Sequence, residues 1–357
     1  MTETDQKIFT SSIKEIKTPE YNQVMNMKTG FMARWGKNKD DDPKYSPIGP
    51  ELIDMEVSTI CHGINKVTCS HCYKGNTGIG ENMSYDTFKS IFDKLPMNVS
   101  QIAFGIGDID ANTDLWSMMA YCRMNGANMV VPNITINGFG LTNEYAKALS
   151  ILCGAVSVSR YDDKDCCYEA IKKLTDLGMT QVNIHLLVSE ETIDRCYETI
   201  DDAVNDPRLS KLNSIVLLTL KPKGCRNKLN VLKQDSYSKL IDDMLKMSEE
   251  KKVKVGFDSC SAPKFLEAVK DHPKLESFKT MVEPCESTLF SIYINVKGEA
   301  FPCSFMEGEE GWIEGIDTVD CFDFLNDVWY NDRIKSFRKS LMLQSGDCRT
   351  CPYFNIY

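Results

Sequence analysis

The stretch "ELIDMEVSTICHGINKVTCSHC", residues 51–72, joins an apolar, strand-like run to a loop with three closely spaced cysteines. Cys61, Cys69 and Cys72 have the spacing C-x7-C-x2-C. A structural zinc site is closed by four protein ligands, whereas three ligands leave one position of a metal centre open. The stretch therefore predicts a strand whose end carries a metal centre at which another molecule can bind.

Outward from this stretch, strand-like and helix-like segments alternate. Apolar runs such as "QIAFGIG" and "QVNIHLLV" alternate with helix-length segments such as "SYDTFKSIFDKL" and "DCCYEAIKKLTDLG". Ser84 is the expected N-cap of the first of these helices, and the second is expected to end at Gly178. Strands that are apolar on both faces, with helical connections, are typical of a parallel sheet covered by helices. About six βα units are too few to close an eight-stranded barrel, so we expect an α/β fold with a partial (β/α)6 TIM-like barrel.

The expected domains are an N-terminal extension at residues 1–50, the barrel core at 51–260 and a smaller C-terminal domain at 261–357. The extension is polar and rich in turns, and we expect it to pack on the body. In parallel α/β barrels the chemistry lies at the C-terminal ends of the strands. The cysteine loop follows the first barrel strand and should lie on that face.

Composition and charge exclude some partners. The 357 residues have ordinary globular composition and a net charge of −10, which argues against nucleic acid as the main partner. The sequence contains no apolar run of membrane-spanning length, and the N-terminus has no signal-peptide core. We therefore expect a cytoplasmic protein without a membrane partner.

The chain has 15 cysteines, which in a protein of this type indicate metal or redox chemistry and not a disulfide framework. Free cysteine is also a common small core residue. We expect packing roles for Cys122, Cys153, Cys166, Cys167, Cys196, Cys225 and Cys321.

A second group of cysteines lies near the C-terminus. Cys285 and Cys303 flank a hairpin-like segment with Gly298 in its turn, and Cys348 and Cys351 form a C-x2-C pair. Two separated pairs are what a closed four-ligand site needs. The cysteines alone leave zinc and an iron–sulfur cluster as alternatives.

The cysteine loop, the βα order and the strand-end motifs resemble those of radical S-adenosylmethionine (SAM) enzymes over residues 50–351. The family's usual spacing is C-x3-C-x2-C, so the longer first gap is a departure. The resemblance implies that Cys61, Cys69 and Cys72 hold three irons of a [4Fe–4S] cluster and that SAM binds the fourth. From the residues alone, a zinc site completed by His62 or His71 is the alternative.

The same resemblance implies a SAM site built from strand ends. Its candidate residues are His71 between the last two cysteines, Gly105, Gly107 and Asp108 in "FGIGD", Thr135 and Asn137 in "ITING", and Ser157, Ser159 and Arg160 in "SVSR". The glycine motif would meet the methionyl amine, His71 the adenine and Arg160 the carboxylate. An ordinary glycine-rich turn is the structural alternative for the motif. His185 and Lys221 end the next two strands and face either substrate or core.

The C-terminal cysteines resemble a twitch or SPASM domain, and their number favours the twitch form with one auxiliary [4Fe–4S] cluster held by Cys285, Cys303, Cys348 and Cys351. Cys260, at the end of the last barrel strand, is either a hydrogen-atom donor, as in radical peptide epimerases, or a packing residue.

The implied activity is reductive cleavage of SAM to a 5′-deoxyadenosyl radical that abstracts a substrate hydrogen. We expect a peptide or protein substrate that is crosslinked, oxidised or epimerised, with the auxiliary cluster assisting electron transfer. A radical dehydrogenase of a small alcohol or sugar derivative and a non-catalytic metal-binding scaffold are the alternatives. The expected electron donor is a flavodoxin or a ferredoxin.

Overall fold

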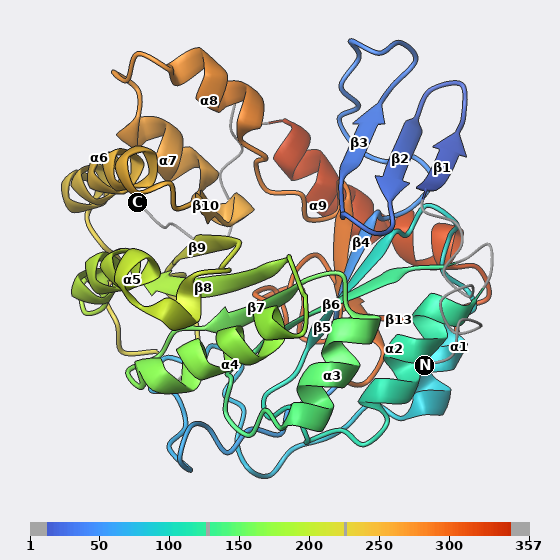
Figure 1. Cartoon of the computed structure of the whole chain (residues 1–357). Helices are drawn as coiled ribbons and strands as arrows, with labels where there is room; N and C mark the ends of the chain where they lie inside the picture. Colours follow the sequence, from blue (N-terminus) through green and yellow to red (C-terminus); the bar gives the residue numbers. More distant parts are fainter. Residues whose placement is uncertain (1–12, 126–128, 225–226, 344–357) are drawn as a thin grey trace.

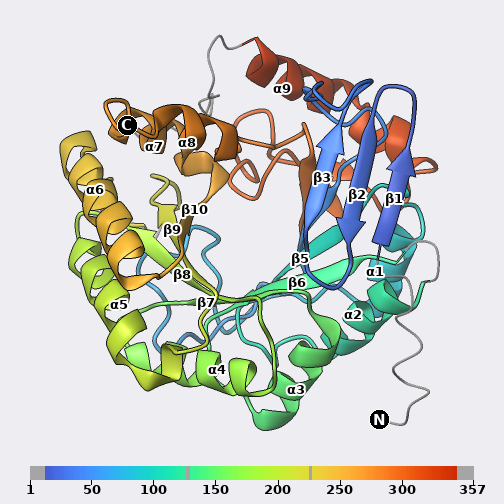
Figure 2. The same ribbon diagram turned by 45° about the horizontal axis from the view of Figure 1, so that its top comes forward.

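The computed structural model describes residues 13–125, 129–224 and 227–343 (Figure 1). Its central part is a series of βα units, and Figure 2 shows their helices on the outer side of a curved sheet. The elements are β4 (Leu52–Glu56), α1 (Tyr85–Phe92), β5 (Gln101–Gly105), α2 (Leu115–Met124), β6 (Val131–Ile136), α3 (Asn143–Leu152), β7 (Val156–Ser159), α4 (Lys164–Asp176), β8 (Val182–Val188), α5 (Ile193–Asn205), β9 (Ser214–Thr219), α6 (Gln234–Lys251) and β10 (Val255–Phe257).

Strands β4 to β10 are parallel and lie side by side in sequence order. The expected parallel α/β architecture is therefore confirmed. Local signals act as predicted: the Ser84 side chain accepts a hydrogen bond from the Thr87 amide at the start of α1. Gly178, just after α4, has a φ of 90°, which a residue with a Cβ rarely adopts.

The C-terminal strands extend the same sheet. Strand β11 (Ser291–Ile294) pairs in parallel with β4, and β12 (Glu299–Phe301) and β13 (Ile316–Asp317) continue antiparallel beyond it. Gly298 has a φ of 82° in the turn between β11 and β12, so the expected hairpin is confirmed. The backbone of this hairpin is therefore hydrogen-bonded to the strand that leads into the cysteine loop.

The remaining helices include α7 (Ala262–Ala268), α8 (Leu275–Met281) and α9 (Asp332–Met342), the last of which follows a π-helical segment at Phe324–Trp329. The Trp329 indole N–H donates to the backbone oxygen of Ser46 at 3.0 Å. None of the helices in the described parts of the chain is long and apolar enough to cross a membrane.

The N-terminal extension contains strands that the sequence did not reveal. β1 (Ile13–Lys17), β2 (Asn22–Asn26) and β3 (Met32–Trp35) form a small antiparallel sheet. Arg34 of β3 packs over the Phe290 ring and pairs with Glu51 and Glu286 at 3.1 and 3.3 Å. The extension thus packs on the body, as expected.

Candidate functional site

The cysteine loop, residues 61–82, is joined to the ends of β5 and β6 by side-chain contacts. One Asp108 carboxylate oxygen accepts the His62 backbone N–H at 2.7 Å and lies 2.8 Å from the His62 Nδ1. The Asn137 amide nitrogen lies 3.5 Å from the other Asp108 oxygen. Two predicted SAM residues from different strands therefore meet beside the first cysteine of the loop. Sequence reasoning considered His62 only as a zinc ligand and did not predict this pair.

Gly107 allows the loop to approach β5 closely. A Cβ at this position would lie 2.3 Å from the Ile60 backbone oxygen and 2.4 Å from the Cys61 Cβ. At Gly105, by contrast, a Cβ would lie 3.5 Å from the Glu56 Cα, an ordinary contact. The absence of a side chain at Gly107 thus sets the position of Cys61.

The loop also reaches the end of β7 through a residue that the sequence did not single out. Tyr161 lies two residues beyond the end of β7, and burial raises the pKa of its phenol. Its ring centroid lies 6.0 Å from that of His71, whose pKa burial lowers. The sequence offered one signal that could have identified this residue, because Tyr161 directly follows the predicted strand end "SVSR".

The sheet register places further predicted SAM residues in one row. Gly105 pairs with Thr135 and Thr135 pairs with Ser157 across β5, β6 and β7. Residues opposite one another in neighbouring strands direct their side chains to the same face. The structure therefore brings these three positions together.

Arg160 occupies a different environment. Its guanidinium pairs with Glu198 of α5 at 2.8 Å and lies 5.6 Å from the ring centroid of Tyr168 in α4. Its Nε and Nη1 atoms are buried without a hydrogen-bond partner among the described residues. These contacts favour a role in joining β7 to the helices, and the predicted contact with a SAM carboxylate stays a prediction.

The three loop cysteines are half-buried. Burial is the largest cause that raises the pKa of Cys61 to about 11. Among the described residues, no three His, Cys, Asp or Glu side chains are arranged around one metal ion. A [4Fe–4S] cluster binds each thiolate through a different iron, so its ligands need not converge on one point. Three thiols on one loop are a donor set that a [4Fe–4S] cluster accepts, with one iron left open.

A second set of cysteines lies in the C-terminal half of the chain. Cys260 lies in the turn that follows β10, and burial raises the pKa of its thiol well above the usual value. Cys285 is buried and Cys303 is half-buried. The buried Lys221 forms an ion pair with Asp258, two residues before Cys260. Cys348 and Cys351 lie outside the described residues.

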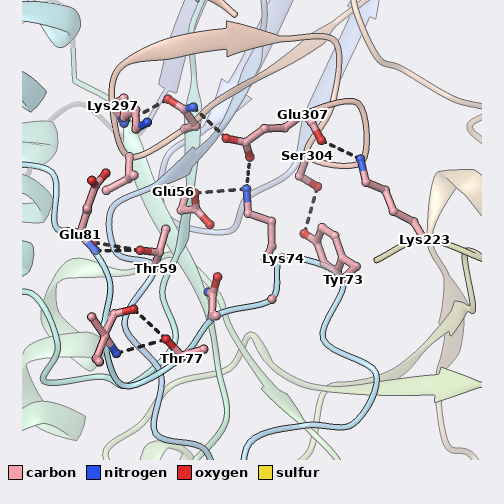
Figure 3. Close-up of a pocket in the computed structure, with 15 residues that line it drawn as sticks. Glu56, Thr59, Tyr73, Lys74, Thr77, Glu81, Lys223, Lys297, Ser304 and Glu307 are labelled. Atoms are coloured by element: carbon pink, nitrogen blue, oxygen red, sulfur yellow. Dashed lines mark hydrogen bonds and ion pairs between the residues drawn. The ribbon is translucent and has the colours of Figure 1, made fainter. Parts of the chain in front are cut away.

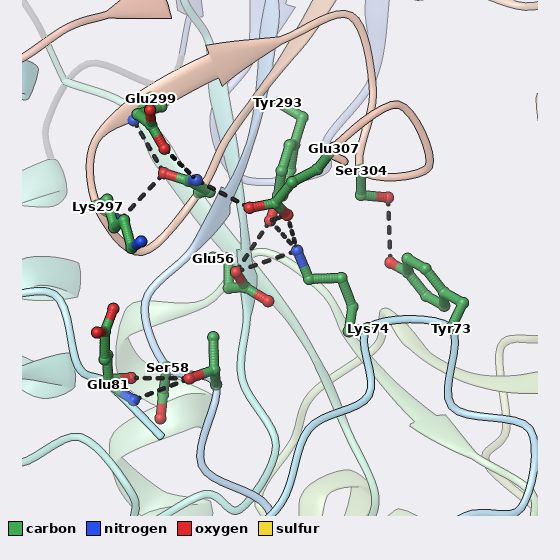
Figure 4. Close-up of polar contacts among 12 residues, drawn as sticks. Glu56, Ser58, Tyr73, Lys74, Glu81, Tyr293, Lys297, Glu299, Ser304 and Glu307 are labelled. Carbon is green, nitrogen blue, oxygen red and sulfur yellow. Dashed lines mark hydrogen bonds and ion pairs between the residues drawn. The ribbon is translucent and has the colours of Figure 1, made fainter. Parts of the chain in front are cut away.

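A polar network connects the two cysteine regions. Figures 3 and 4 show Lys74 of the cysteine loop directed at Glu56 of β4 and at Glu307, which lies beyond β12. The Lys74 ammonium lies 3.2 Å from the Glu56 carboxylate, donates to the Tyr293 hydroxyl at 2.7 Å and pairs with Glu307. A cavity of about 370 Å³ beside it is lined by the loop and by Lys297 of the β11–β12 turn. No pattern in the sequence indicated this network.

Most of the cysteines expected to pack are buried. Cys122, Cys153, Cys167 and Cys196 are buried, Cys166 and Cys321 are half-buried, and Cys225 lies outside the described residues.

The sequence matches no protein-family model and no curated protein. Solved structures show clear similarity. SuiB from Streptococcus suis bound to SAM is 14% identical over 82% of this chain and 68% of its own, with a TM-score of 0.64. SuiB bound to the precursor peptide SuiA is 12% identical over 91% of this chain and 88% of its own, with a TM-score of 0.68. The structure of anSMEcpe with bound AdoMet and the Cp18Cys peptide is 14% identical over 83% of this chain and 84% of its own, with a TM-score of 0.59. The chain therefore shares the fold of these structures.

Proposed function

We propose that this protein is a radical SAM enzyme that modifies a peptide or protein. The observation that carries the proposal is the junction between the cysteine loop and the ends of three parallel strands, made by Asp108, Asn137 and Tyr161. The shared fold with SAM-bound structures supports it.

In this proposal, Cys61, Cys69 and Cys72 hold a [4Fe–4S] cluster with one open iron. Bound together, SAM and the cluster would supply a 5′-deoxyadenosyl radical that abstracts a hydrogen atom from the substrate. The protein's own tasks are positioning and exclusion of water. Asp108 orients the loop and offers a carboxylate toward the SAM amine, while the row formed by Gly105, Thr135 and Ser157 leaves a polar surface for the rest of SAM.

A peptide substrate is supported by the comparisons. SuiB was solved with its precursor peptide SuiA and anSMEcpe with the Cp18Cys peptide, and both folds cover more than four fifths of this chain. We propose the same substrate class here. A small alcohol or sugar derivative is the alternative substrate class, and the substrate test below distinguishes it from a peptide.

We further propose that Cys285 and Cys303, together with Cys348 and Cys351, hold an auxiliary [4Fe–4S] cluster. Cys260 would then donate the hydrogen atom of its thiol to a substrate carbon radical. The resulting thiyl radical needs one electron, which the auxiliary cluster can supply, and one proton from solvent. Support comes from the position of Cys260 in the turn that follows β10, the last strand of the parallel series.

The test of the cluster assignment is anaerobic reconstitution with iron and sulfide analysis, followed by reduction with dithionite in the presence of SAM. We expect about eight irons per chain, as two [4Fe–4S] clusters require, and formation of 5′-deoxyadenosine. Cys69→Ala should form none, whereas Cys321→Ser, which changes a half-buried thiol that donates to the Thr318 backbone oxygen, should behave like the wild type. Fully loaded wild-type protein that leaves SAM intact would contradict the proposal, and stoichiometric zinc would favour the scaffold alternative.

The substrate test measures 5′-deoxyadenosine formation with pooled peptides and, separately, with polyols in deuterated water. Stimulation by peptides supports the proposed class, and stimulation by polyols alone contradicts it. Solvent deuterium at carbon that is lost in Cys260→Ala would support the hydrogen-donor role. Undiminished deuterium incorporation in that variant would refute it.

A further inference from the structure

The two cysteine regions touch each other through the residues that follow Cys72 and Cys303. The Tyr73 hydroxyl donates a hydrogen bond to the Ser304 Oγ at 3.0 Å, and Figure 3 shows the two side chains facing each other. The rings of Tyr73 and Phe305 are stacked, with centroids 4.3 Å apart and planes inclined by 27°. Tyr73 and Ser304 are therefore in direct contact, and each is covalently joined to a proposed cluster ligand.

The contact is held from several sides. A Cβ on Gly224, which has a φ of 95°, would lie 2.6 Å from the Tyr73 Cα, so the β9 end packs tightly against this backbone. The Lys221 ammonium lies 5.6 Å from the centroid of the Phe305 ring. The Lys74–Glu307 ion pair ties the two segments together one residue beyond Tyr73. The position of the tyrosine is thus defined by packing and charge on both segments.

We propose that Tyr73 is the bridging residue through which a single electron passes between the cluster held by the loop cysteines and the auxiliary cluster at Cys285 and Cys303. This inference rests on the proposed function. One cluster loses the electron and the other gains it, and no bond is made or broken and no proton is transferred. The direction of transfer depends on whether substrate chemistry releases an electron or consumes one.

The route between the two sites determines how fast an electron can pass from one to the other. Electron tunnelling weakens steeply across empty gaps and far less along covalent bonds, so the number and length of the through-space steps determine the rate. From Cys72 to Cys303 the route through the Tyr73 side chain and Ser304 contains one non-covalent step, the hydrogen bond of 3.0 Å. The stacked Phe305 ring offers a second route of the same kind.

Tyr73 is suited to mediate electron tunnelling without itself being oxidised to a radical. The Tyr73 hydroxyl donates its proton in the hydrogen bond to the Ser304 Oγ. Its partner Ser304 is a hydroxyl and no base able to take that proton. A tyrosyl radical that forms by proton loss is therefore disfavoured, and the electron would tunnel past the ring.

The experiment compares the wild type with Tyr73→Leu, Tyr73→Phe and Ser304→Ala. The matched control is Tyr197→Phe, because Tyr197 donates a similar hydrogen bond to Asp243 in the helical layer. Each reconstituted protein receives less than one equivalent of reductant. Freeze-quench EPR then follows the redistribution of the electron between the two clusters. We expect a several-fold slowing in Tyr73→Leu, smaller slowing in Tyr73→Phe and Ser304→Ala, and none in Tyr197→Phe.

Redistribution at the wild-type rate in fully loaded Tyr73→Leu would overturn the inference. If Tyr73→Leu loads iron poorly, the comparison of Tyr73→Phe and Ser304→Ala with the wild type decides it, since both keep the stacked rings in place. A purely structural role would lower iron content without changing the rate in loaded molecules. Wild-type protein without two clusters contradicts the proposed function instead, and iron analysis reveals that before any rate is measured.

Discussion

The two cysteine regions of this protein are anchored in different ways. The cysteine loop depends on a carboxylate contact from Asp108 and on close packing at Gly107. Between Cys61 and Cys69 it also contains Asn65 and Lys66 in the left-handed region, with φ of 52° and 66°, which is uncommon for residues other than glycine. Side-chain contacts of this kind can shift when a ligand binds nearby.

The C-terminal cysteines Cys285 and Cys303 instead flank backbone that belongs to the main sheet. Strand β11 between them pairs with β4 over four residues, and Ile292 and Ile294 are buried. The region proposed to bind SAM is thus held by contacts between a loop and strand ends, whereas the region proposed to hold the auxiliary cluster is held by pairing within the main sheet. This matches a division between a reactive site and an electron-handling site.

The largest expected effect comes from removing one cysteine of each region. Cys69→Ala should abolish 5′-deoxyadenosine formation, because the open-iron cluster is lost. Cys303→Ala should keep SAM cleavage but lose product formation, because only the auxiliary site is damaged. Each variant should contain about four fewer irons than the wild type. Iron analysis together with chromatography of the nucleoside products measures both effects, and equal loss of SAM cleavage in the two variants would contradict the division.

The next effect concerns the ion network that joins the regions. In Lys74→Met, the buried Glu56 and the half-buried Glu307 lose their cation, and breaking a buried ion pair on one side costs about 3–5 kcal/mol of unfolding free energy. Urea unfolding of the metal-free protein measures the loss. The matched control is Lys89→Met, which removes the exposed Lys89–Asp93 pair of α1 and should leave the midpoint unchanged.

If Lys74→Met unfolds at the wild-type urea concentration, the network does not hold the regions together. We also expect Lys74→Met to lose less unfolding free energy at low pH than at neutral pH. Burial raises the pKa of Glu56, so protonation of this carboxyl in the variant removes the uncompensated charge.

A smaller effect is expected at the close approach between β5 and the loop. Gly107→Ala places a methyl group 2.3 Å from the Ile60 oxygen, and overpacking of this kind costs about 1–3 kcal/mol. Because Cys61 must move to make room, SAM cleavage should fall as well. Gly256→Ala in β10 is the control, since no heavy atom lies within 4 Å of a Cβ there. Unchanged SAM cleavage by Gly107→Ala would show that the loop adapts at no cost.

The elements that the sequence predicted are those that depend on local signals. The buried parallel strands, the Ser84 cap and the glycine turns at Gly178 and Gly298 follow from residues close together in the chain. The row of strand-end residues could be anticipated because parallel strands end on one face. The polar strands β1 to β3 gave no such pattern, since they lack a continuous apolar run.

The contacts that the sequence could not reveal depend on long-range pairing. The pairing of β11 with β4 brings residues more than two hundred positions apart together, and from it follow the Tyr73–Ser304 and Lys74–Glu307 contacts. Neither spacing nor periodicity encodes a register between such distant segments. Tyr161 was missed for a related reason, because only the folded loop places His71 beside it.

The smallest expected effect lies at His185, which does not end its strand as the sequence suggested but lies in the middle of β8, opposite Ser159 of β7. Desolvation lowers the pKa of this imidazole from 6.5 to about 4, so the folded protein favours the neutral ring. Because the folded-state pKa is depressed, the stabilisation is complete above the unfolded-state value of 6.5 and is lost as the pH falls through the window between 6.5 and about 4. Linkage predicts a loss of about 1 kcal/mol when the pH is lowered from about 7 to about 5.5.

His185→Gln removes this titration while keeping a polar side chain of similar size, so the urea midpoint of the metal-free variant should fall less than that of the wild type over the same pH interval. Identical slopes in wild type and His185→Gln would mean that the ring is hydrated in solution. The middle of β8 would then be open to water, and the exclusion of solvent that the proposed radical chemistry needs would have to come from bound substrate.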